Sequence, residues 1–248
     1  TCGLLVQLAA AAPPATRPAA PPANAPSAQP PRLTLTDLKQ GVAAVQFSPD
    51  GKSIAAVGGD GTLRIWDAQS GKLLHTTDKH ADVPLSLAWS PNGKQIASGG
   101  ADRTIRIWDA ATGKKTDEFY QNSAVSQLVF LPDEKHLVAI RYDELQWWNL
   151  TPHAPLLARL VTQGMFAEKL AVTPEGDVVA SDNGSHLVVF AGKDGKILAQ
   201  TTPPHTGPGA NRIMSNASLS KHQVFVSDRF GIFLWDSTDH APKRITKS

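Results

Sequence analysis

Three side chains in one part of the chain are those of a serine hydrolase triad: His80, Ser98 and Asp102. A catalytic serine must be exposed and must lie beside an oxyanion hole. Ser98 instead lies within an alternating apolar segment, between Ala97 and Gly99. Such a segment is expected to bury alternate side chains. We therefore favour a structural role for these three residues over hydrolysis.

The other residue types that carry chemistry do not form a recognisable site. The 8 histidines are scattered without the spacing of zinc ligands, and the single cysteine, Cys2, cannot form an internal disulfide. The glycine pairs at 58–59 and 99–100 connect strand to strand, whereas a phosphate loop must be followed by a helix N-terminus. We predict no metal site, no cofactor and no enzymatic activity.

The charge pattern argues against nucleic acid as a partner. The chain has 24 Lys and Arg residues against 22 Asp and Glu residues, and no long run of like charge. Nucleic-acid-binding domains usually carry a basic patch or stripe. No membrane contact is expected from the repeat region described next.

A repeated segment dominates the sequence. Residues 95–109 read QIASGGADRTIRIWD, and residues 53–67 read SIAAVGGDGTLRIWD. Both alternate apolar residues on either side of a glycine-containing turn, which predicts a β-hairpin. The aromatic residue that ends each such unit recurs at intervals of 40 to 45 residues, at Trp66, Trp108, Trp148, Phe190 and Trp235.

On these aromatic residues, and on the Trp-Asp pairs at 66–67, 108–109 and 235–236, the chain resembles the WD40-repeat family. The resemblance implies an all-β fold, a β-propeller of four-stranded antiparallel blades, with five blades in this chain. A short strand at Arg32–Thr36 and a last strand at Lys243–Lys247 would flank them. A closed five-blade ring and an incomplete ring of a larger propeller of about seven blades both stay open.

The resemblance also implies a role for the triad-like residues. In such families they form a chain of hydrogen bonds from the Trp108 indole to Ser98, His80 and Asp102, which satisfies buried polar groups. The other repeats keep fewer of these residues. The first has Ala56 at the serine position and Leu38 near the histidine position, the third keeps Asp143 and Trp148, and the fourth keeps Ser181.

The N-terminal region differs in composition from the repeats. Residues 1–12 resemble the remnant of a signal peptide or an anchor. Residues 13–31 contain 8 prolines and 6 alanines and predict a disordered linker. The propeller is expected at 32–248, with repeats at about 41–77, 83–119, 124–161, 166–202 and 211–247. These features predict a secreted or periplasmic protein with an N-terminal tether; a cytoplasmic location is the alternative.

Exposed loops at one rim of the propeller are the expected binding surface. Aromatic and arginine residues in such loops are the usual anchors of protein interfaces. The candidates are Asp82, Tyr120, Arg141, Tyr142, Asp143, Arg229 and Phe230.

The function predicted from the sequence is a non-catalytic scaffold that binds a protein or peptide partner through these loops. Two alternatives remain: the propeller portion of a larger secreted enzyme or redox protein, or a structural protein tethered to the cell envelope. The sequence does not name the partner, since a fold by itself does not specify function.

Overall fold

The computed structural model describes the backbone of the chain in segments, at 34–35, 38, 40–141, 144–150, 156–161, 167–182, 187–201, 215–220, 223–228, 231–236 and 242–244. All of them belong to one compact unit, Leu33–Ser248. No described residue lies in a helix. The predicted leader and linker, residues 1–31, fall outside the described residues, so those predictions stay open.

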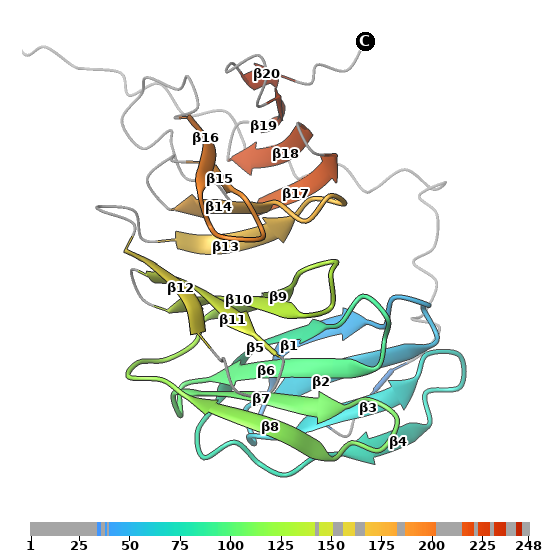
Figure 1. The fold of residues 1–248 in the computed structure, drawn as a ribbon. Helices are drawn as coiled ribbons and strands as arrows, with labels where there is room; N and C mark the ends of the chain where they lie inside the picture. The colour runs from blue at the N-terminus through green and yellow to red at the C-terminus, as the bar shows by residue number, and fades with distance from the viewer. Residues whose placement is uncertain are drawn as a thin grey trace, which may run out of the picture. The chain divides into compact units, whose positions relative to one another are not determined.

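The described strands form five four-stranded antiparallel sheets (Figure 1). The first two sheets are β1 (Val42–Phe47), β2 (Ser53–Gly58), β3 (Leu63–Asp67) and β4 (Leu73–Thr76), then β5 (Pro84–Trp89), β6 (Gln95–Gly100), β7 (Thr104–Asp109) and β8 (Lys115–Tyr120). The third is β9 (Gln127–Phe130), β10 (His136–Arg141), β11 (Glu144–Asn149) and β12 (Leu156–Val161). The last two are β13 (Ala167–Val172), β14 (Val178–Asp182), β15 (Leu187–Phe190) and β16 (Ile197–Thr201), then β17 (Ser215–Ser220), β18 (Gln223–Asp228), β19 (Gly231–Asp236) and β20 (Pro242–Arg244).

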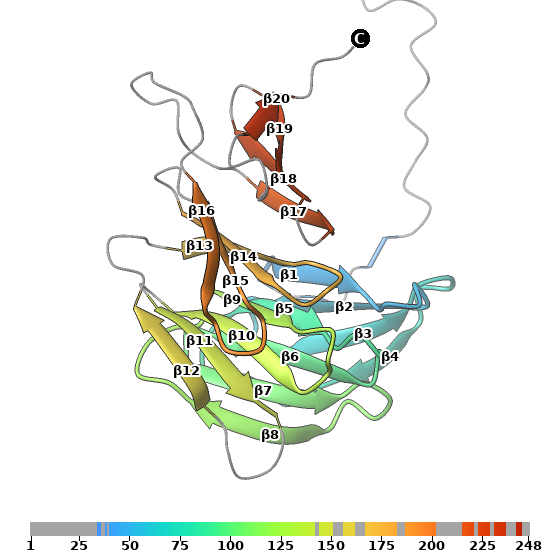
Figure 2. The same cartoon turned by 45° about the horizontal axis from the view of Figure 1, so that its top comes forward.

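This architecture confirms the all-β prediction and gives sheets of the kind that form propeller blades. Each strand pairs with the next along the chain, so every sheet is a simple meander (Figures 1 and 2). The prediction of a strand at Arg32–Thr36 is not supported, because Thr34 and Leu35, its two described residues, are not in a strand. An outer strand needs a third strand beside it, and each described sheet already has its four. The last described strand is β20, which begins one residue before the predicted Lys243.

The turn between the first and second strands recurs with one geometry. The amide of the fourth turn residue donates to the carbonyl of the first, as from Gly51 to Ser48 and from Gly93 to Ser90, both at 2.9 Å. This fourth residue has a positive φ of 70° in Gly51 and 71° in Gly93, a region that glycine adopts without strain. In the third sheet Glu134 takes this position with φ 63°, in agreement with its drift from the glycine pattern.

In the first two sheets, the aspartate of the Trp-Asp pair closes the turn between the third and fourth strands. Asp67 Oδ1 accepts hydrogen bonds from the Ser70 hydroxyl at 2.6 Å and from the Ser70 amide at 2.7 Å. Asp109 Oδ1 accepts the same pair from Thr112, at 2.7 and 2.8 Å. These bonds, first of all those from the hydroxyls, lower the pKa of both carboxyls.

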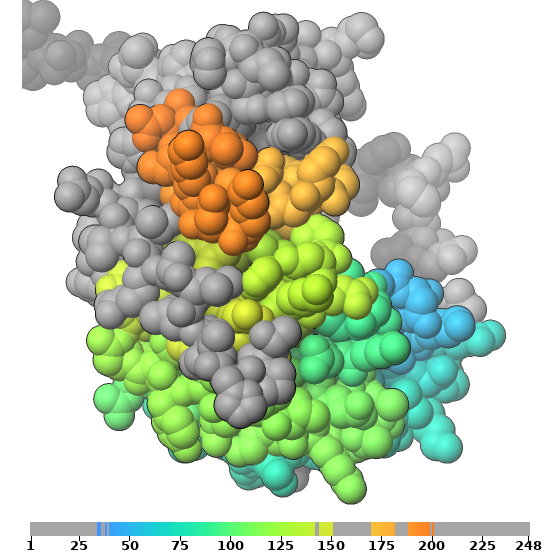
Figure 3. Space-filling model, viewed as in Figure 1, coloured from blue at the N-terminus to red at the C-terminus, as the bar shows by residue number. Residues whose placement is uncertain are grey.

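The core lies between successive sheets. Ala55, Leu63 and Ile65 of the first sheet pack against Ile96 and Trp108 of the second. The second sheet packs against the third in the same way, and the third against the fourth. Figure 3 shows the second sheet (green) and the third (yellow-green) in continuous contact. The second and third sheets thus each bury one face against the sheet before them and the other against the sheet after them.

Candidate functional site

The structure brings His80, Ser98, Asp102 and Trp108 together in one chain of hydrogen bonds. Trp108 Nε1 lies 2.8 Å from Ser98 Oγ, which lies 2.7 Å from His80 Nε2. His80 Nδ1 lies 2.9 Å from Asp102 Oδ2. Ser98 is on β6 and Trp108 on β7, Asp102 is in the turn between these strands, and His80 is in the connection before β5.

The proton positions in this network follow from its first member. An indole nitrogen can only donate, so Ser98 Oγ accepts from Trp108 and donates its own proton to His80 Nε2. His80 then carries its proton on Nδ1 and donates it to Asp102. Burial lowers the pKa of His80, although the Asp102 charge opposes the shift, so the imidazole is neutral at pH 7.

Asp102 ends the network as a carboxylate. Its burial favours protonation, but hydrogen bonds and the nearby imidazole outweigh this and lower its pKa. Besides His80, it accepts from the Thr104 hydroxyl at 2.8 Å and from the Ala81 amide at 3.0 Å. These bonds hold the connection before β5 against the turn between β6 and β7.

This geometry does not present Ser98 as a nucleophile. Ser98 is 0% exposed, and its oxygen is already engaged by the Trp108 indole, whereas a hydrolytic serine must reach its substrate. The His80 ring contacts the Trp108 ring edge-on, with centroids 6.4 Å apart. The arrangement can satisfy buried polar groups and fix two loops, which is a structural task.

The strand register shows that the serine is particular to the second sheet. Ser98 pairs with Arg106, two residues before Trp108. The residues in the same register in the other described sheets are Ala56, Ala139, Ala180 and Val226. The assignment of Ser181 to this position was wrong by one residue. Ser181 pairs with Leu187 and so belongs to the opposite face of its sheet.

The third sheet shows the consequence of losing that hydroxyl. Its indole at the equivalent register, Trp148 Nε1, is buried without a hydrogen-bond partner in the described part of the chain. Two pairs along from the Leu137–Trp148 pair, where the second sheet has Ser98, the third sheet has Ala139. An unsatisfied buried donor costs roughly 1–3 kcal/mol. The third sheet must therefore depend more on apolar packing.

Two of the predicted binding residues, Asp82 and Tyr120, lie on the rim that carries this network. We call it the network rim: the turns between second and third strands, with the connections between sheets. Backbone bonds join the two kinds of loop, from Ala101 N to Val83 O at 2.9 Å and from Gln121 N to Arg103 O at 2.7 Å. Tyr120 lies there with 77% of its surface exposed.

Of the other predicted anchors, the structure places two. Asp82 is exposed, and its carboxylate accepts from the Val83 amide at 2.7 Å. Arg141 contradicts the expectation of an exposed loop: it is the last residue of β10, is 4% exposed and forms an ion pair with Glu144. Burial and pairing leave its guanidinium little access to a partner. The remaining candidates lie outside the described residues: Tyr142, Asp143, Arg229 and Phe230.

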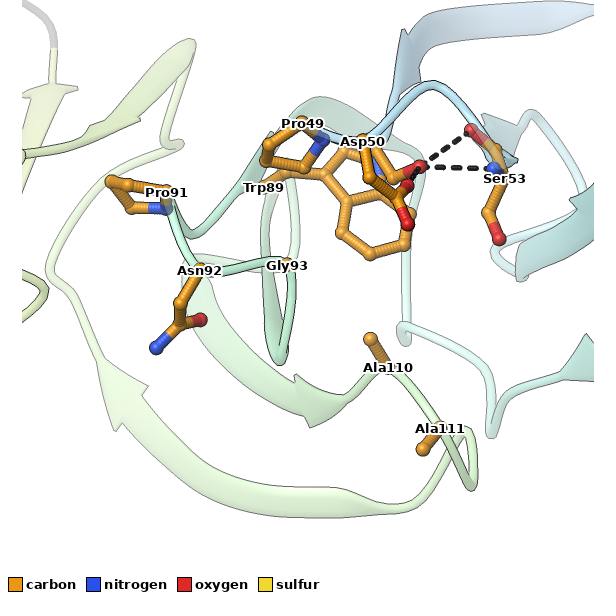
Figure 4. Close-up of a pocket in the computed structure, with 10 residues that line it drawn as sticks. Pro49, Asp50, Ser53, Trp89, Pro91, Asn92, Gly93, Ala110 and Ala111 are labelled. Atoms are coloured by element: carbon orange, nitrogen blue, oxygen red, sulfur yellow. Dashed lines mark hydrogen bonds between the residues drawn. The ribbon is translucent and has the colours of Figure 1, made fainter.

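The sequence prediction missed a pocket on the opposite rim, which we call the turn pocket. It measures about 460 Å³ and lies between the first and second sheets. Figure 4 shows the Trp89 indole beside the turn of Pro49 and Asp50, with Pro91 on the neighbouring turn and Ala111 on the turn after β7. The repeated Ser-Pro-Asp-Gly and Ser-Pro-Asn-Gly turns were the available signal, but turn type alone does not reveal a hollow.

The turn pocket recurs two sheets further along the chain. A pocket of about 360 Å³ between the third and fourth sheets is lined by Pro132, Gly176 and Ala191 in corresponding places. Between the second and third sheets, the turns are bridged instead by Asn92 Nδ2, which donates to Glu134 Oε2 at 2.7 Å. The two pockets thus lie at equivalent turns of the repeat.

The described segments show neither a metal cluster nor a membrane-spanning helix. They contain no group of three or more His, Cys, Asp or Glu side chains placed to hold a metal ion. Nor do they contain a helix with the length and apolar character needed to cross a membrane.

Comparison with known families agrees with the blade-like sheets. The pattern of the WD domain, G-beta repeat family matches residues 30–67 and 71–109. The chain carries WD40 repeats. The resemblance expected from the Trp-Asp pairs is therefore confirmed for the first two repeats.

One curated protein is similar to part of the chain. The probable serine/threonine-protein kinase PkwA of Thermomonospora curvata is 42% identical over 52 residues, which cover 21% of this chain and 7% of that protein. The matched stretch thus spans a small fraction of the kinase. WD40 domains generally serve as non-catalytic scaffolds for protein interactions, and so short a match is no guide to catalysis.

Proposed function

We propose that this WD40-repeat chain is a non-catalytic scaffold that binds a protein or peptide through the network rim. The observation that carries the proposal is Tyr120, the one aromatic side chain exposed on this rim among the described residues, at 77%. Tyrosine supplies a large, rigid contact area and is enriched among the residues that dominate interface energetics. Asp82 adds an exposed carboxylate on the same rim.

The rim is also held in place before any partner arrives. Asp102 ties the Ala81 amide to the turn between β6 and β7, and the Val125 amide donates to Gly100 O at 3.1 Å. Loops that are already ordered lose less conformational freedom on binding. The buried network therefore supports binding indirectly, by positioning loops rather than by contact.

A peptide library displayed on phage and selected against the whole chain tests this proposal. We expect selected peptides to lose at least about tenfold in affinity when Tyr120→Ala is introduced, and less with Asp82→Ala. Gln69→Ala is the matched control, because Gln69 is also exposed but belongs to a turn on the opposite rim. Peptides that bind all three variants equally would contradict the network rim as the binding surface.

The turn pocket supports a second binding surface. Trp89, Pro49 and Pro91 line it together with polar side chains such as Asp50 and Asn92. Ligand sites combine apolar side chains with polar groups that fix the orientation of the ligand. Ala111→Glu, at an exposed residue that lines the pocket, would fill it. Peptides that respond to this substitution and not to Tyr120→Ala would assign binding to the turn pocket.

We also infer that the five sheets are successive blades of one propeller. The three interfaces among the first four sheets follow one rule, in which one face of a sheet packs against the opposite face of the next sheet. Small twisted sheets of this kind hide their apolar faces by stacking around an axis. Chemical cross-links between neighbouring sheets only, mapped by mass spectrometry, are the expected result; links that skip a sheet would contradict it.

A further inference from the structure

The turn between β6 and β7 carries a charged residue where the first sheet has a glycine. Gly61 follows Asp60 in the first sheet, and Arg103 follows Asp102 in the second. Gly61 has a φ of 87° and Arg103 a φ of 64°, so both turns require the left-handed region. Glycine adopts this region freely, whereas a residue with a β-carbon is strained there. The arginine therefore strains a turn that the neighbouring sheet forms without strain.

A second charged residue with a positive φ shows what such a side chain can do. Among the described residues, Arg103 and Glu134 are the two charged residues in this conformation. Glu134 bridges two sheets, because its Oε2 accepts from Asn92 Nδ2 at 2.7 Å. Arg103 is exposed, and its guanidinium forms no hydrogen bond or ion pair with another described residue. Since strained residues often serve in ligand contacts, the unused guanidinium indicates a partner outside the described part of the chain.

The backbone holds Arg103 in place at the tip of its turn. Its amide donates to Gly100 O at 3.2 Å, and its carbonyl accepts from the Gln121 amide at 2.7 Å. The next residue, Thr104, pairs with Tyr120 across β7 and β8. The turn is thus fixed next to the strand end that carries the exposed Tyr120. A residue whose backbone is already ordered loses less conformational freedom on binding.

Asp82 flanks the same turn on its other side. The carbonyl of the next residue, Val83, accepts a hydrogen bond from the Ala101 amide at 2.9 Å. An exposed carboxylate, a guanidinium and a phenol ring therefore follow one another along the network rim. A guanidinium can form two parallel hydrogen bonds with one carboxylate, whereas the charge of Asp82 repels further acidic groups. This order fits a peptide with one acidic residue beside an apolar residue, rather than a run of acidic residues.

We propose that Arg103 and Tyr120 together select a peptide in which an acidic residue stands next to an apolar one. The guanidinium pairs with the side-chain carboxylate of the acidic residue, and the tyrosine ring packs against its apolar neighbour. This inference rests on the proposed function, because it assigns a partner chemistry to the network rim. The turn of the first sheet, with Gly61 in place of the arginine, offers no such pairing.

Peptides selected from the phage library against the whole chain test this pairing. The tightest binder is synthesised as selected, and again with asparagine or glutamine in place of its acidic residues. We expect the wild type to bind the acidic form about tenfold more tightly than the amide form, as measured by fluorescence anisotropy. Arg103→Gly should bind both forms equally, with the affinity that the wild type has for the amide form.

Two further variants separate binding from folding. Arg103→Gly copies the turn of the first sheet and removes its strain, so its melting temperature should be no lower than that of the wild type, as followed by circular dichroism. Lys72→Ala is the charge-matched control, because Lys72 is also exposed but belongs to the turn between β3 and β4 on the opposite rim. It should keep the tenfold preference for the acidic form.

A charge reversal gives the converse test. Peptides selected against Arg103→Glu should carry a basic residue where those selected against the wild type carry an acidic one. Equal binding of the acidic and amide forms by the wild type would overturn the inference. If Tyr120→Ala still weakens those peptides, the network rim remains the binding surface and only the role of Arg103 is lost. Peptides that neither Tyr120→Ala nor Arg103→Gly weakens would contradict the proposed function as well.

Discussion

The first and second sheets are near copies in sequence, yet they satisfy the same aspartate position in different ways. Asp60 in the first sheet binds the Arg64 guanidinium at 3.0 Å and the Thr62 hydroxyl at 2.6 Å. Asp102 in the second binds His80 and Thr104, and Arg106 is 3.6 Å from it. The repeat therefore sets the position of the aspartate, while the surrounding residues determine which side chains donate hydrogen bonds to it.

The residue that makes this difference lies before each sheet. A β-carbon placed on Gly58 would meet the Leu38 side chain at 2.9 Å and Asp60 Oδ1 at 3.1 Å. One placed on Gly100 would meet Asp102 Oδ1 at 2.9 Å and His80 Nδ1 at 3.1 Å. Leu38 and His80 thus fill the same space. Where an imidazole fills it, the aspartate has a neutral donor; where a leucine fills it, the arginine must supply the donors.

The same choice decides where the arginine goes. Arg64 is committed to Asp60, and the residue across from it on β4 is Thr76. Arg106 instead pairs with Glu118 on β8, at 2.7 Å from Nε to Oε1. One histidine therefore changes the partners of two charged side chains.

Replacing His80 by leucine should destabilise the second sheet more than the other substitutions described below. His80→Leu copies the first sheet at one position only, and it removes the partner of the Ser98 hydroxyl and a donor to Asp102. Two buried polar groups lose a bond, so we expect the free energy of unfolding to fall by about 3 kcal/mol, measured by urea denaturation. Leu38→Ala in the first sheet is a size control without a polar term. A loss below about 1 kcal/mol would mean that the network contributes little.

The sheets could be predicted from the sequence because the pattern of each repeat lies within one short segment. Alternation, the turn residues and the Trp-Asp pair all occur within some forty residues, and the four network residues followed from the resemblance to the WD40-repeat family. What failed depended on register or on burial. Ser181 was placed one residue from its true register, and Arg141 was expected in the open although Glu144 draws it into the protein. The turn pocket arises only where two sheets meet, so the pattern within a single repeat does not predict it.

Low pH should remove the contribution that the Asp60 carboxylate makes to the stability of the first sheet. Burial opposes ionisation of Asp60, but hydrogen bonds from Thr62 and Arg64 outweigh it and lower the pKa to about 2, from 3.8. A lowered folded-state pKa stabilises the protein above pH 4 and loses this effect as the pH falls from about 4 to about 2. We expect Asp60→Asn to cost about 2 kcal/mol at pH 7 and progressively less below pH 4.

Urea denaturation of both proteins at several pH values measures this difference. Asp67→Asn serves as the control, because its carboxyl is in an exposed turn rather than against a guanidinium. A cost of Asp60→Asn that stays constant down to pH 2 would show that the Arg64 pair does not set the pKa.

The double variant Ser98→Ala/His80→Leu copies two positions of the first sheet. Its loss in free energy of unfolding should be smaller than the sum of the losses of the two single variants. Ser98→Ala alone leaves the Trp108 donor and the His80 acceptor without partners, and His80→Leu alone leaves the Ser98 hydroxyl proton without an acceptor. In the double variant the Ser98–His80 bond is absent from both sides, so its loss is counted once. We expect a coupling of about 1 kcal/mol in a double-mutant cycle, measured by thermal and urea unfolding. Additive losses would mean that the four residues do not act as one network. Loss of a measured hydrolytic activity in a folded variant would support a catalytic role for Ser98, His80 and Asp102.

The smallest expected effect tests whether the histidine really redirects Arg106. Glu118→Thr places on β8 the residue that the first sheet has opposite Arg64. Glu118 is partly exposed, with 19% of its side chain accessible, and Lys115 also binds it at 2.9 Å, so we expect a loss of only about 0.5 kcal/mol. In a His80→Leu background the loss should shrink further, because Arg106 is then free to close on Asp102, as Arg64 does on Asp60. An equal loss in both backgrounds, measured at the same salt concentration, would show that Arg106 prefers Glu118 for reasons unrelated to His80. The two sheets would then share the position of the aspartate but not the cause of the arginine's pairing.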